Sequence, residues 1–299
     1  DVVVHLAAHA KVHQLVAHPH RALENTMMTF NVLEYCRQRR LPLVFSSTRE
    51  VYGDVHRFEG YGEETADFAF TESPYSASKI ASEAFIYAYA RCYGLKYIAF
   101  RFSNVYGRFD NDLHRMSRVL PLFIHSMSRD EPITVFGGAD KVLDFTYVDD
   151  CVDGISRGIA ALVEGRVTNE TINLAFGEGN TLVRAAELIA AELDVEPKMT
   201  IAPSLLGEVT RYVADIRKAH DLLDWTPQVP LDEGIPRAVA WFQDHRAAHP
   251  EEDKPVVNEG DSSISSFDDL AGKTTAQSLT INWYELAQES GANVEAVEG

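Results

Sequence analysis

The sequence LVFSSTREVYG, residues 43–53, joins an apolar run to two serines, a threonine and a short polar segment. An apolar run that stops at hydroxyl side chains is typical of a buried strand in a parallel sheet, whose carboxyl end borders a ligand site. Downstream, residues 74–79 read PYSASK, so Tyr75 and Lys79 are four residues apart. That spacing puts both side chains on one face of a helix. The two segments therefore predict a strand and a helix that bring Thr48, Tyr75 and Lys79 together.

These three side chains are the groups that hydride transfer on a secondary alcohol requires. A free phenol has a pKa of about 10, so Tyr75 acts as a base near neutrality only where positive charge stabilises its phenolate. Lys79 lies one helical turn away and would supply that charge, and Thr48 would hydrogen-bond the same substrate hydroxyl. A Tyr-x-x-x-Lys pattern alone occurs on many solvated helices, so its weight comes from the strand motif that precedes it.

Strand-like and helix-like segments alternate along the first hundred residues. We expect strands at 1–8, 41–47 and 96–102, and helices at 22–39 and from 74 onward. This alternation predicts an α/β fold with a doubly wound parallel sheet. Beyond it the order is less regular, and we expect a smaller α/β lobe. The elements of that lobe are a helix at 118–128, a strand at 133–136, a turn at 137–138, a helix that opens at 149–150, a strand at 170–174 and helices at 183–193 and 235–245.

With these motifs the chain resembles the extended short-chain dehydrogenase/reductase family, and within it the NAD-dependent nucleotide-sugar epimerases and dehydratases. The resemblance runs from Asp1 to about Asp244. It implies a Rossmann-type sheet that binds NAD, with Thr48, Tyr75 and Lys79 as catalytic residues. The residues that it places around the cofactor are Ala7, Ala8, Asn25, Ser46, Ser47, Tyr75 and Lys79.

The resemblance also implies roles for the residues around the cofactor. Ala7 and Ala8 would end the strand that passes beneath it, where small side chains allow close approach. Asn25 would help to order the catalytic loop, and Ser46 and Ser47 would line the nicotinamide ribose. Together they form the nicotinamide side of the predicted site.

The glycine-rich turn that holds the cofactor pyrophosphate in this family has no counterpart here, since neither G-x-x-G-x-x-G nor G-x-G-x-x-G occurs. Residues 1–8 match the family's fourth strand, so we expect the first three strands to be missing and the sheet to be poorly stable alone. Residues 1–108 would be the C-terminal part of the NAD-binding domain. Residues 109–249 would be mainly the substrate-binding lobe, with some segments returning to the first sheet. Residues 250–299 would be an acidic, poorly ordered tail with a weak helical pattern at 283–287.

The residues that follow Thr48 discriminate between the reactions of the family. Dehydratases carry Thr-Asp-Glu there, and Arg49 replaces the Asp that would protonate the departing hydroxyl, so dehydration is disfavoured. Glu50 matches the decarboxylases, but these also use an arginine at the position of Leu143. Epimerases need only the three catalytic residues. The pattern therefore favours epimerisation.

The leading interpretation is an NAD-dependent 4-epimerase of a UDP-sugar that acts through a transient 4-keto intermediate. The sugar pair would be UDP-glucose and UDP-galactose, or UDP-glucuronate and UDP-galacturonate. A UDP-glucuronate decarboxylase or another nucleotide-sugar lyase is the second interpretation, and a non-catalytic NAD(P)-binding or scaffold protein is the third. The residues assigned to the substrate are Arg49, Glu50, Asn104, Arg115, Arg118, Glu208 and Arg211.

The resemblance assigns parts of the substrate to several of these residues. Arg211, Glu208 and Asn104 match family positions that meet the diphosphate, the nucleotide ribose and a phosphate. Because the arginine that many epimerases direct at the diphosphate is absent, Arg115 and Arg118 are candidates to replace it. A guanidinium binds a diphosphate and a hexuronate carboxylate equally well, so both sugar pairs stay open.

Charge and composition restrict the partners. The 299 residues carry a net charge of −18, and residues 250–299 hold eleven Asp or Glu against two lysines. An acidic chain repels nucleic acid and anionic lipid, so we expect neither as a partner. No apolar run approaches the ~20 residues of a membrane span, and no secretion leader is visible. Three widely separated cysteines predict free thiols and a cytoplasmic protein.

Two further expectations concern metals and assembly. His5, His9 and His13 have the spacing of ligands on one helical face, but His5 belongs to a strand and no Cys or carboxylate completes a set. We therefore expect no metal. By analogy with family members we expect a homodimer through the helices at 22–39 and 74–93.

Overall fold

The structure is a computed structural model that describes residues 1–54, 60–111, 113, 118–250, 274–278 and 293–297. The chain divides into two compact units, residues 1–253 and 254–299. The helices of the first unit are α1 (Val12–Ala17), α2 (His20–Arg39), α3 (Pro74–Tyr93), α4 (Val119–Met127), α5 (Val148–Val163), α6 (Leu182–Leu193), α7 (Arg217–Leu223) and α8 (Leu231–Ala248), with the 3₁₀ helices η1 (Arg49–Tyr52), η2 (Glu63–Thr65) and η3 (Phe68–Phe70). Its strands are β1 (Val3–His5), β2 (Leu43–Thr48), β3 (Tyr97–Phe102), β4 (Asn104–Tyr106), β5 (Ile133–Phe136), β6 (Val142–Tyr147), β7 (Glu170–Leu174), β8 (Gly179–Thr181) and β9 (Met199–Ala202).

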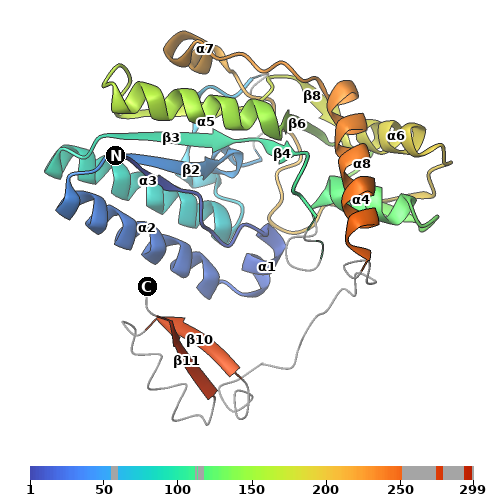
Figure 1. Cartoon of the computed structure of the whole chain (residues 1–299), viewed down its shortest axis with the longest axis horizontal. Coiled ribbons are helices and arrows are strands. Elements are labelled where there is room, and N and C mark those ends of the chain that lie inside the picture. The colour runs from blue at the N-terminus through green and yellow to red at the C-terminus, as the bar shows by residue number, and fades with distance from the viewer. Residues whose placement is uncertain (55–59, 112, 114–117, 251–273, 279–292, 298–299) are drawn as a thin grey trace. The chain divides into compact units, whose positions relative to one another are not determined.

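A four-stranded sheet forms the centre of the first unit. Its strand order is β1-β2-β3-β7, and all neighbours are parallel. Helices α2 and α3 cover one face and α5 covers the other (Figure 1). The side chains of β2 alternate between these layers: Leu43 and Phe45 pack with Leu33 and Ile86 of α2 and α3, whereas Val44 packs in the core beneath α5. The predicted α/β fold with a doubly wound parallel sheet is confirmed.

Helix α3 has clear signals at both ends. Ser73 Oγ accepts a hydrogen bond from the backbone N of Ser76 at 3.1 Å, and Ser76 Oγ accepts one from the backbone N of Ser73 at 3.1 Å. This reciprocal cap, with Pro74 at the first helical position, sets the start of the helix. Gly94 ends it with a left-handed φ of 71°. The local sequence thus determines the length of the helix that carries the predicted catalytic pair.

Two smaller groups of strands follow the sheet. In β4-β6-β8, β4 and β6 are parallel and β6 and β8 antiparallel, and β5 pairs with β9 in parallel. The wholly buried Asp144 of β6 accepts hydrogen bonds from the backbone N of Phe176 and Gly177 at 2.9 Å and of Ala214 at 3.2 Å. Burial raises the pKa of Asp144 to about 6, and these hydrogen bonds act in the opposite direction. One carboxylate therefore joins β6 to two later segments of the chain.

The sequence predicted the long elements better than the short ones. Strands β5 and β7 begin and end at the predicted residues, α4 is one residue shorter than predicted at each end, and α6 begins one residue earlier. Helix α8 begins four residues before the predicted start, because Asp232 and Glu233 form an acidic first turn that favours a helix N-terminus. The predicted strand 1–8 is reduced to Val3–His5. Strand β6 was not predicted, because the polar Asp144 and Thr146 are buried there by contacts from distant segments.

In the described part of the second unit, β10 (Thr274–Ser278) and β11 (Asn293–Val297) pair in parallel. The sequence predicted no strand in this part of the chain. The helical pattern at 283–287 lies outside the described residues. The predicted division at residue 108 lies inside the first compact unit, and β7 from the later part of the chain joins the first sheet, as the expectation of returning segments anticipated.

Helix α5 approaches the sheet closely through two glycines. A Cβ atom at Gly154 would lie 2.2 Å from Leu174 Cδ2, and one at Gly158 would lie 2.4 Å from Phe100 Cζ. Leu174 and Phe100 are both fully buried. Because neither neighbour has free space to move into, these positions accept no side chain without a shift of the helix.

We expect Gly158→Val to lower the free energy of unfolding by about 2 kcal/mol, since overpacking a core costs roughly 1–3 kcal/mol. Urea unfolding followed by circular dichroism measures this. Ser156→Val, at an exposed position of the same helix, is the matched control and should change stability by less than about 0.5 kcal/mol. Equal losses in the two variants would show that the close packing of α5 is not what requires the glycine.

Candidate active site

Thr48, Tyr75 and Lys79 meet where α3 packs on the carboxyl end of β2 (Figure 1). Lys79 Nζ donates a hydrogen bond to the carbonyl oxygen of Ser46 at 2.6 Å and lies 6.0 Å from the centroid of the Tyr75 ring. The Thr48 side chain is hydrogen-bonded to Tyr75. All four residues are buried. The predicted catalytic residues therefore form one preorganised cluster.

The Tyr75 hydroxyl is harder to ionise in this protein than a free phenol. Burial raises the pKa of Tyr75 to about 12, and the hydrogen bond with Thr48 acts in the opposite direction. Among the neighbouring charges, Glu50 raises this pKa and Arg49 lowers it. The sequence predicts that Lys79 lowers the pKa of Tyr75, whereas in this structure burial outweighs the positive charges. A base that works near neutrality therefore needs further positive charge beside the phenol.

Lys79 is a buried ammonium that keeps hydrogen-bond capacity. Burial lowers the pKa of Lys79 to about 8, and the Glu83 carboxylate acts in the opposite direction. An ammonium has three N–H donors, and within the described part of the chain Ser46 accepts one of them. Donors remain for a ligand hydroxyl, which agrees with the position beside the cofactor that the family resemblance implies for Lys79.

Asn25 holds the segment that follows β1. Its Oδ1 accepts a hydrogen bond from the backbone N of His9 at 2.8 Å, and its Nδ2 donates to the His9 carbonyl oxygen at 3.0 Å and to Ser78 Oγ at 3.2 Å. These contacts tie the segment to α3, consistent with the predicted ordering role. Ala7 is exposed and Ala8 is half-buried, and both lie after the end of β1 rather than in it. No side chain larger than a methyl group projects from these two positions.

Ser47 has a different environment from the one predicted. Its hydroxyl donates to Glu83 Oε1 of α3 at 2.5 Å. Glu83 is paired in turn with Arg101 of β3, with Arg101 Nη2 2.7 Å from Glu83 Oε2. The sequence analysis did not single out this buried ion pair. The available signal was an arginine within the apolar strand YIAFRF, because a buried charge requires a partner.

Arg49 and Glu50 form a second buried pair near Tyr75. Arg49 Nη2 lies 3.0 Å from Glu50 Oε1 and donates to Asn104 Oδ1 at 3.3 Å. Arg49 Nη1 and Glu50 Oε2 are buried and have no hydrogen-bond partner among the described residues. Burial raises the pKa of Glu50, and Arg49 acts in the opposite direction. A donor and an acceptor are thus left for a polar ligand beside the phenol.

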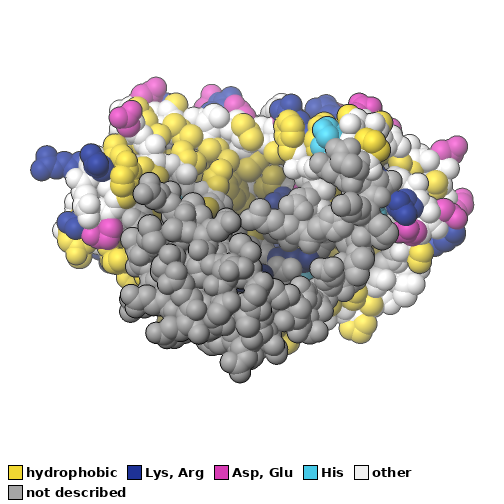
Figure 2. Space-filling model, turned by 60° about the horizontal axis from the view of Figure 1, so that its bottom comes forward, with side chains coloured by type: hydrophobic (Ala, Val, Ile, Leu, Met, Phe, Trp, Pro, Cys, Tyr) yellow, Lys and Arg dark blue, Asp and Glu magenta, His cyan; other side chains and the backbone are white. Residues whose placement is uncertain are grey.

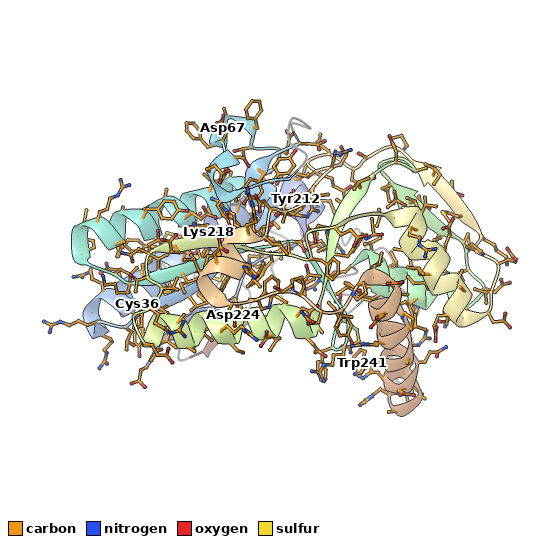
Figure 3. All side chains as sticks on the ribbon, turned by 90° about the horizontal axis from the view of Figure 1, so that it is seen from above. Cys36, Asp67, Tyr212, Lys218, Asp224 and Trp241 are labelled. Carbon is orange, nitrogen blue, oxygen red and sulfur yellow. The ribbon has the colours of Figure 1, made fainter. Side chains whose placement is uncertain are left out.

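Tyr212 packs against this second pair. The Arg49 guanidinium carbon lies 5.9 Å from the centroid of the Tyr212 ring, and that ring contacts the rings of Tyr52 and Tyr61 at centroid distances of 5.6 and 5.5 Å. Tyr212 is wholly buried. In Figure 3 it lies between the parallel sheet and the region of α6 and α8. This aromatic cluster therefore links the predicted cofactor side to the predicted substrate side.

Lys141 is a buried cation that the sequence analysis missed. Its Nζ donates to Glu208 Oε2 at 2.8 Å, and both charges act on the pKa of Glu50. Lys141 immediately precedes β6, two residues before Leu143 in the chain. A Cβ atom at Gly137 would lie 2.4 Å from Lys141 Cδ. The absence of a side chain at Gly137 thus makes room for Lys141. The Gly137-Gly138 turn was the feature of the sequence that pointed to this close approach.

The other predicted substrate residues are dispersed. Arg118 precedes α4, is exposed, and its Nη1 lies 3.6 Å from Asp110 Oδ2. Its charge acts to lower the pKa of Tyr75, so it lies within electrostatic reach of the cluster. Arg211 is exposed. Arg115 lies outside the described residues.

Two of the three histidines considered as metal ligands have other contacts. His5 Nε2 lies 3.3 Å from Thr29 Oγ1, and burial lowers the pKa of His5 to about 4. His9 Nε2 lies 2.8 Å from Glu24 Oε2. In the described part of the chain, no group of three or more His, Cys, Asp or Glu side chains is placed to hold a metal ion. None of the described helices is both long and apolar enough to span a bilayer.

Comparison with known proteins places this arrangement in a family. The model of the NAD dependent epimerase/dehydratase family matches residues 1–175. The chain belongs to this family. A putative UDP-glucose 4-epimerase of Methanocaldococcus jannaschii is 31% identical over 248 residues, which cover 82% of this chain and 78% of that protein. The dTDP-glucose 4,6-dehydratase of Neisseria meningitidis serogroup B is 29% identical, with 82% and 73% covered.

A solved relative agrees with the family. The UDP-glucose 4-epimerase of Thermus thermophilus, crystallised as a complex with NAD, is similar with a TM-score of 0.73 and 31% sequence identity. The similarity covers 81% of this chain and 77% of that one. The family and its NAD-dependent chemistry are thereby established, and both epimerases and dehydratases are among the relatives.

Proposed function

We propose that this protein is an NAD-dependent 4-epimerase of a UDP-sugar. The observation that supports the proposal most strongly is the buried cluster at the carboxyl end of β2. There Thr48 is hydrogen-bonded to Tyr75, and Lys79 lies one helical turn beyond Tyr75. A phenol paired with a hydroxyl in this way is placed to receive a substrate alcohol and to remove its proton.

The chain fits the nicotinamide side of a bound NAD. Lys79 retains donors for a ribose hydroxyl, and Asn25 orders the segment in which Ala7 and Ala8 carry only methyl groups. NAD held by these residues would supply the acceptor for the hydride of carbon 4 and the donor for its return, and it would add positive charge beside Tyr75. That charge acts in the direction that the buried phenol requires.

The chain's own residues then move one proton. Tyr75 takes the proton from the carbon 4 hydroxyl as the hydride leaves carbon 4, so the alcohol becomes a ketone. Thr48 keeps the hydroxyl in line, and the Lys79 ammonium favours the ionised phenol. The keto-sugar then rotates and presents its opposite face, so the hydride returns to carbon 4 with the opposite configuration. Tyr75 returns the proton to oxygen 4. Protons and electrons balance, so the reaction is an isomerisation.

Arg49 is the residue that separates this site from a dehydratase. Its guanidinium cannot protonate a departing hydroxyl near neutrality, and its Nη2 is engaged with Glu50 and Asn104. A dehydration requires an acid at the position of Arg49, and the arginine does not supply one. The proposal therefore favours epimerisation over elimination.

We propose that the UDP part of the substrate contacts the polar residues at the group of strands β4-β6-β8. Lys141 and Glu208 form a pair there, and Asn104 donates to the Asp144 carbonyl oxygen at 3.0 Å. The residues available for the diphosphate, the ribose and the sugar are Arg49, Asn104, Arg118, Lys141, Glu208 and Arg211. Both the hexose and the hexuronate remain candidates for the sugar.

A UDP-glucuronate decarboxylase is the second candidate, and Glu50 is the observation that favours it. Glu50 is buried, its pKa is raised by burial, and its Oε2 has no partner among the described residues. Such a carboxyl group is able to exchange a proton with a ligand. Leu143 opposes this reading, because it is buried where a decarboxylase carries an arginine.

We also propose that two copies associate through α2 and α3. These adjacent helices carry several exposed apolar side chains, and Figure 2 shows hydrophobic groups exposed among charged ones on one face of the molecule. The exposed apolar residues of the two helices are Leu23, Met27, Tyr35, Phe85 and Tyr93. A set of this kind on one pair of helices is typical of a protein–protein interface.

With NAD supplied, we expect the protein to interconvert either UDP-glucose and UDP-galactose or the corresponding uronates, as followed by proton NMR of the sugars. Tyr75→Phe should lower the rate by about 10²–10⁴-fold, because a phenyl ring exchanges no proton. Tyr93→Phe, at an exposed position of the same helix, should retain the rate. A keto-deoxy sugar or carbon dioxide as the sole product would contradict the proposal.

Glu50→Gln distinguishes the two candidate reactions. In an epimerase we expect a loss of no more than about tenfold, because the Glu50 charge raises the pKa of Tyr75 and its removal does not disable the base. A decarboxylase that uses Glu50 should lose at least about 100-fold. Carbon dioxide release and sugar NMR on the same samples separate the outcomes, and the thermal unfolding midpoint checks that the variant folds.

Met27→Glu should shift the protein from dimer to monomer, because a charge would be buried at the α2 and α3 surface. Sedimentation velocity at several protein concentrations measures the change. Val152→Glu introduces the same charge at an exposed position of α5, on the opposite face of the sheet, and should leave the association unchanged. A monomeric parent protein, or equal behaviour of both variants, would refute this interface.

A further inference from the structure

The Glu83–Arg101 ion pair lies directly beneath the catalytic cluster. Glu83 is one helical turn beyond Lys79 on α3, and Arg101 lies in the central strand β3 (Figure 1). Arg101 Nε donates to Glu83 Oε1 at 3.0 Å and Arg101 Nη2 to Glu83 Oε2 at 2.7 Å, so the contact is bidentate. Their exposed fractions are only 4% and 5%. A two-point contact of this kind fixes a carboxylate in both position and orientation.

Further hydrogen bonds surround both charges. Besides Ser47, the Tyr87 hydroxyl donates to Glu83 Oε2 at 2.7 Å. Arg101 Nη1 donates to the Tyr52 hydroxyl at 3.2 Å and to a backbone carbonyl oxygen of η2 at 2.9 Å. Every nitrogen of the guanidinium is therefore occupied. Such a fully satisfied buried network holds α3, β2 and β3 in one relative position.

Two charged groups of α3 act on adjacent residues of β2. Lys79 Nζ bonds the carbonyl oxygen of Ser46, and Glu83 bonds the hydroxyl of Ser47. The Lys79 ammonium is buried and has a carboxylate one turn away as its supporting charge. Burial lowers the pKa of Lys79 to about 8, and Glu83 is the group that opposes this. Loss of the Glu83 charge would therefore lower the pKa of Lys79 further and favour its neutral form.

We propose that Glu83 is a positioning residue for the reaction: clamped by Arg101, it fixes the end of β2 through Ser47 and holds a carboxylate one helical turn from the Lys79 ammonium. Its effect on rate rests on the proposed function. Its effect on Lys79 is a property of the protein alone, so the two parts are separable by experiment.

The direct test is the titration of Lys79, followed by NMR of protein labelled with ¹³C at the lysine ε-carbon, with the signal assigned from Lys79→Arg. Glu83→Gln should lower the midpoint of Lys79 by about half a pH unit or more, because a nearby negative charge is removed. Tyr87→Phe is the matched control: it deletes one hydrogen bond to Glu83 and no charge, so the midpoint should stay within about 0.2 units of the parent. Glu83→Asp keeps the negative charge, so its Lys79 midpoint should lie close to the parental value.

The rate profile gives the second readout. Lys79 must be charged to support the phenolate, so a lower Lys79 midpoint should move the alkaline fall of kcat to lower pH by the same amount, with little change in KM. A uniform loss of rate at every pH with an unchanged Lys79 midpoint would overturn the proposal and leave Glu83 a purely structural residue. A shifted midpoint in a protein without epimerase activity would refute the proposed function and support the role of Glu83.

Glu83→Gln leaves Arg101 buried without its counter-charge and is expected to destabilise the fold. The double variant Glu83→Gln/Arg101→Gln removes both charges and keeps the test available if the single variant does not fold. Because the double variant also removes the positive charge of Arg101, its Lys79 midpoint should fall less below the parental value than that of Glu83→Gln. A folded double variant with a lower Lys79 midpoint than Glu83→Gln would also overturn the proposal.

Discussion

The packing of α3 on the carboxyl end of β2, secured by the buried Glu83–Arg101 pair, is the contact on which the rest of the site depends. Each of three residues spaced by one turn on α3 engages one of three consecutive residues of β2. A strand presents successive residues in alternate directions, so the match works only at one relative position of helix and strand. The ion pair resists sliding because any shift would leave two charges buried and unpaired.

A second buried carboxylate has the same effect on the other side of the site. Asp144 accepts hydrogen bonds from three backbone N–H groups of segments that are far apart in the sequence. Together with the cluster of Tyr52, Tyr61 and Tyr212, it connects the later strands to the sheet. The predicted catalytic and substrate sides are thus joined by polar and aromatic contacts rather than by continuous secondary structure.

The differences from relatives gather around the phenol. Arg49 stands where a dehydratase has its acid and is paired with the neighbouring Glu50. Leu143 stands where an arginine is usual, and Lys141 lies two residues earlier in a pair with Glu208. Arg49 and Glu50 are therefore charges that act on Tyr75, and Lys141 and Glu208 act in turn on Glu50.

The sequence by itself predicted the long elements and the candidate residues: the helix that Pro74 begins, the buried strand at 41–47, and Thr48, Tyr75 and Lys79 as candidates. Local signals suffice for these, because caps, glycine ends and apolar periodicity act over a few residues. Tertiary structure alone decided that Ser47 binds Glu83, that Arg49 pairs with Glu50, that Lys141 is buried on Glu208, and that burial raises the pKa of Tyr75. Desolvation and ion pairing depend on which distant residues surround a group, and no local pattern specifies that surrounding.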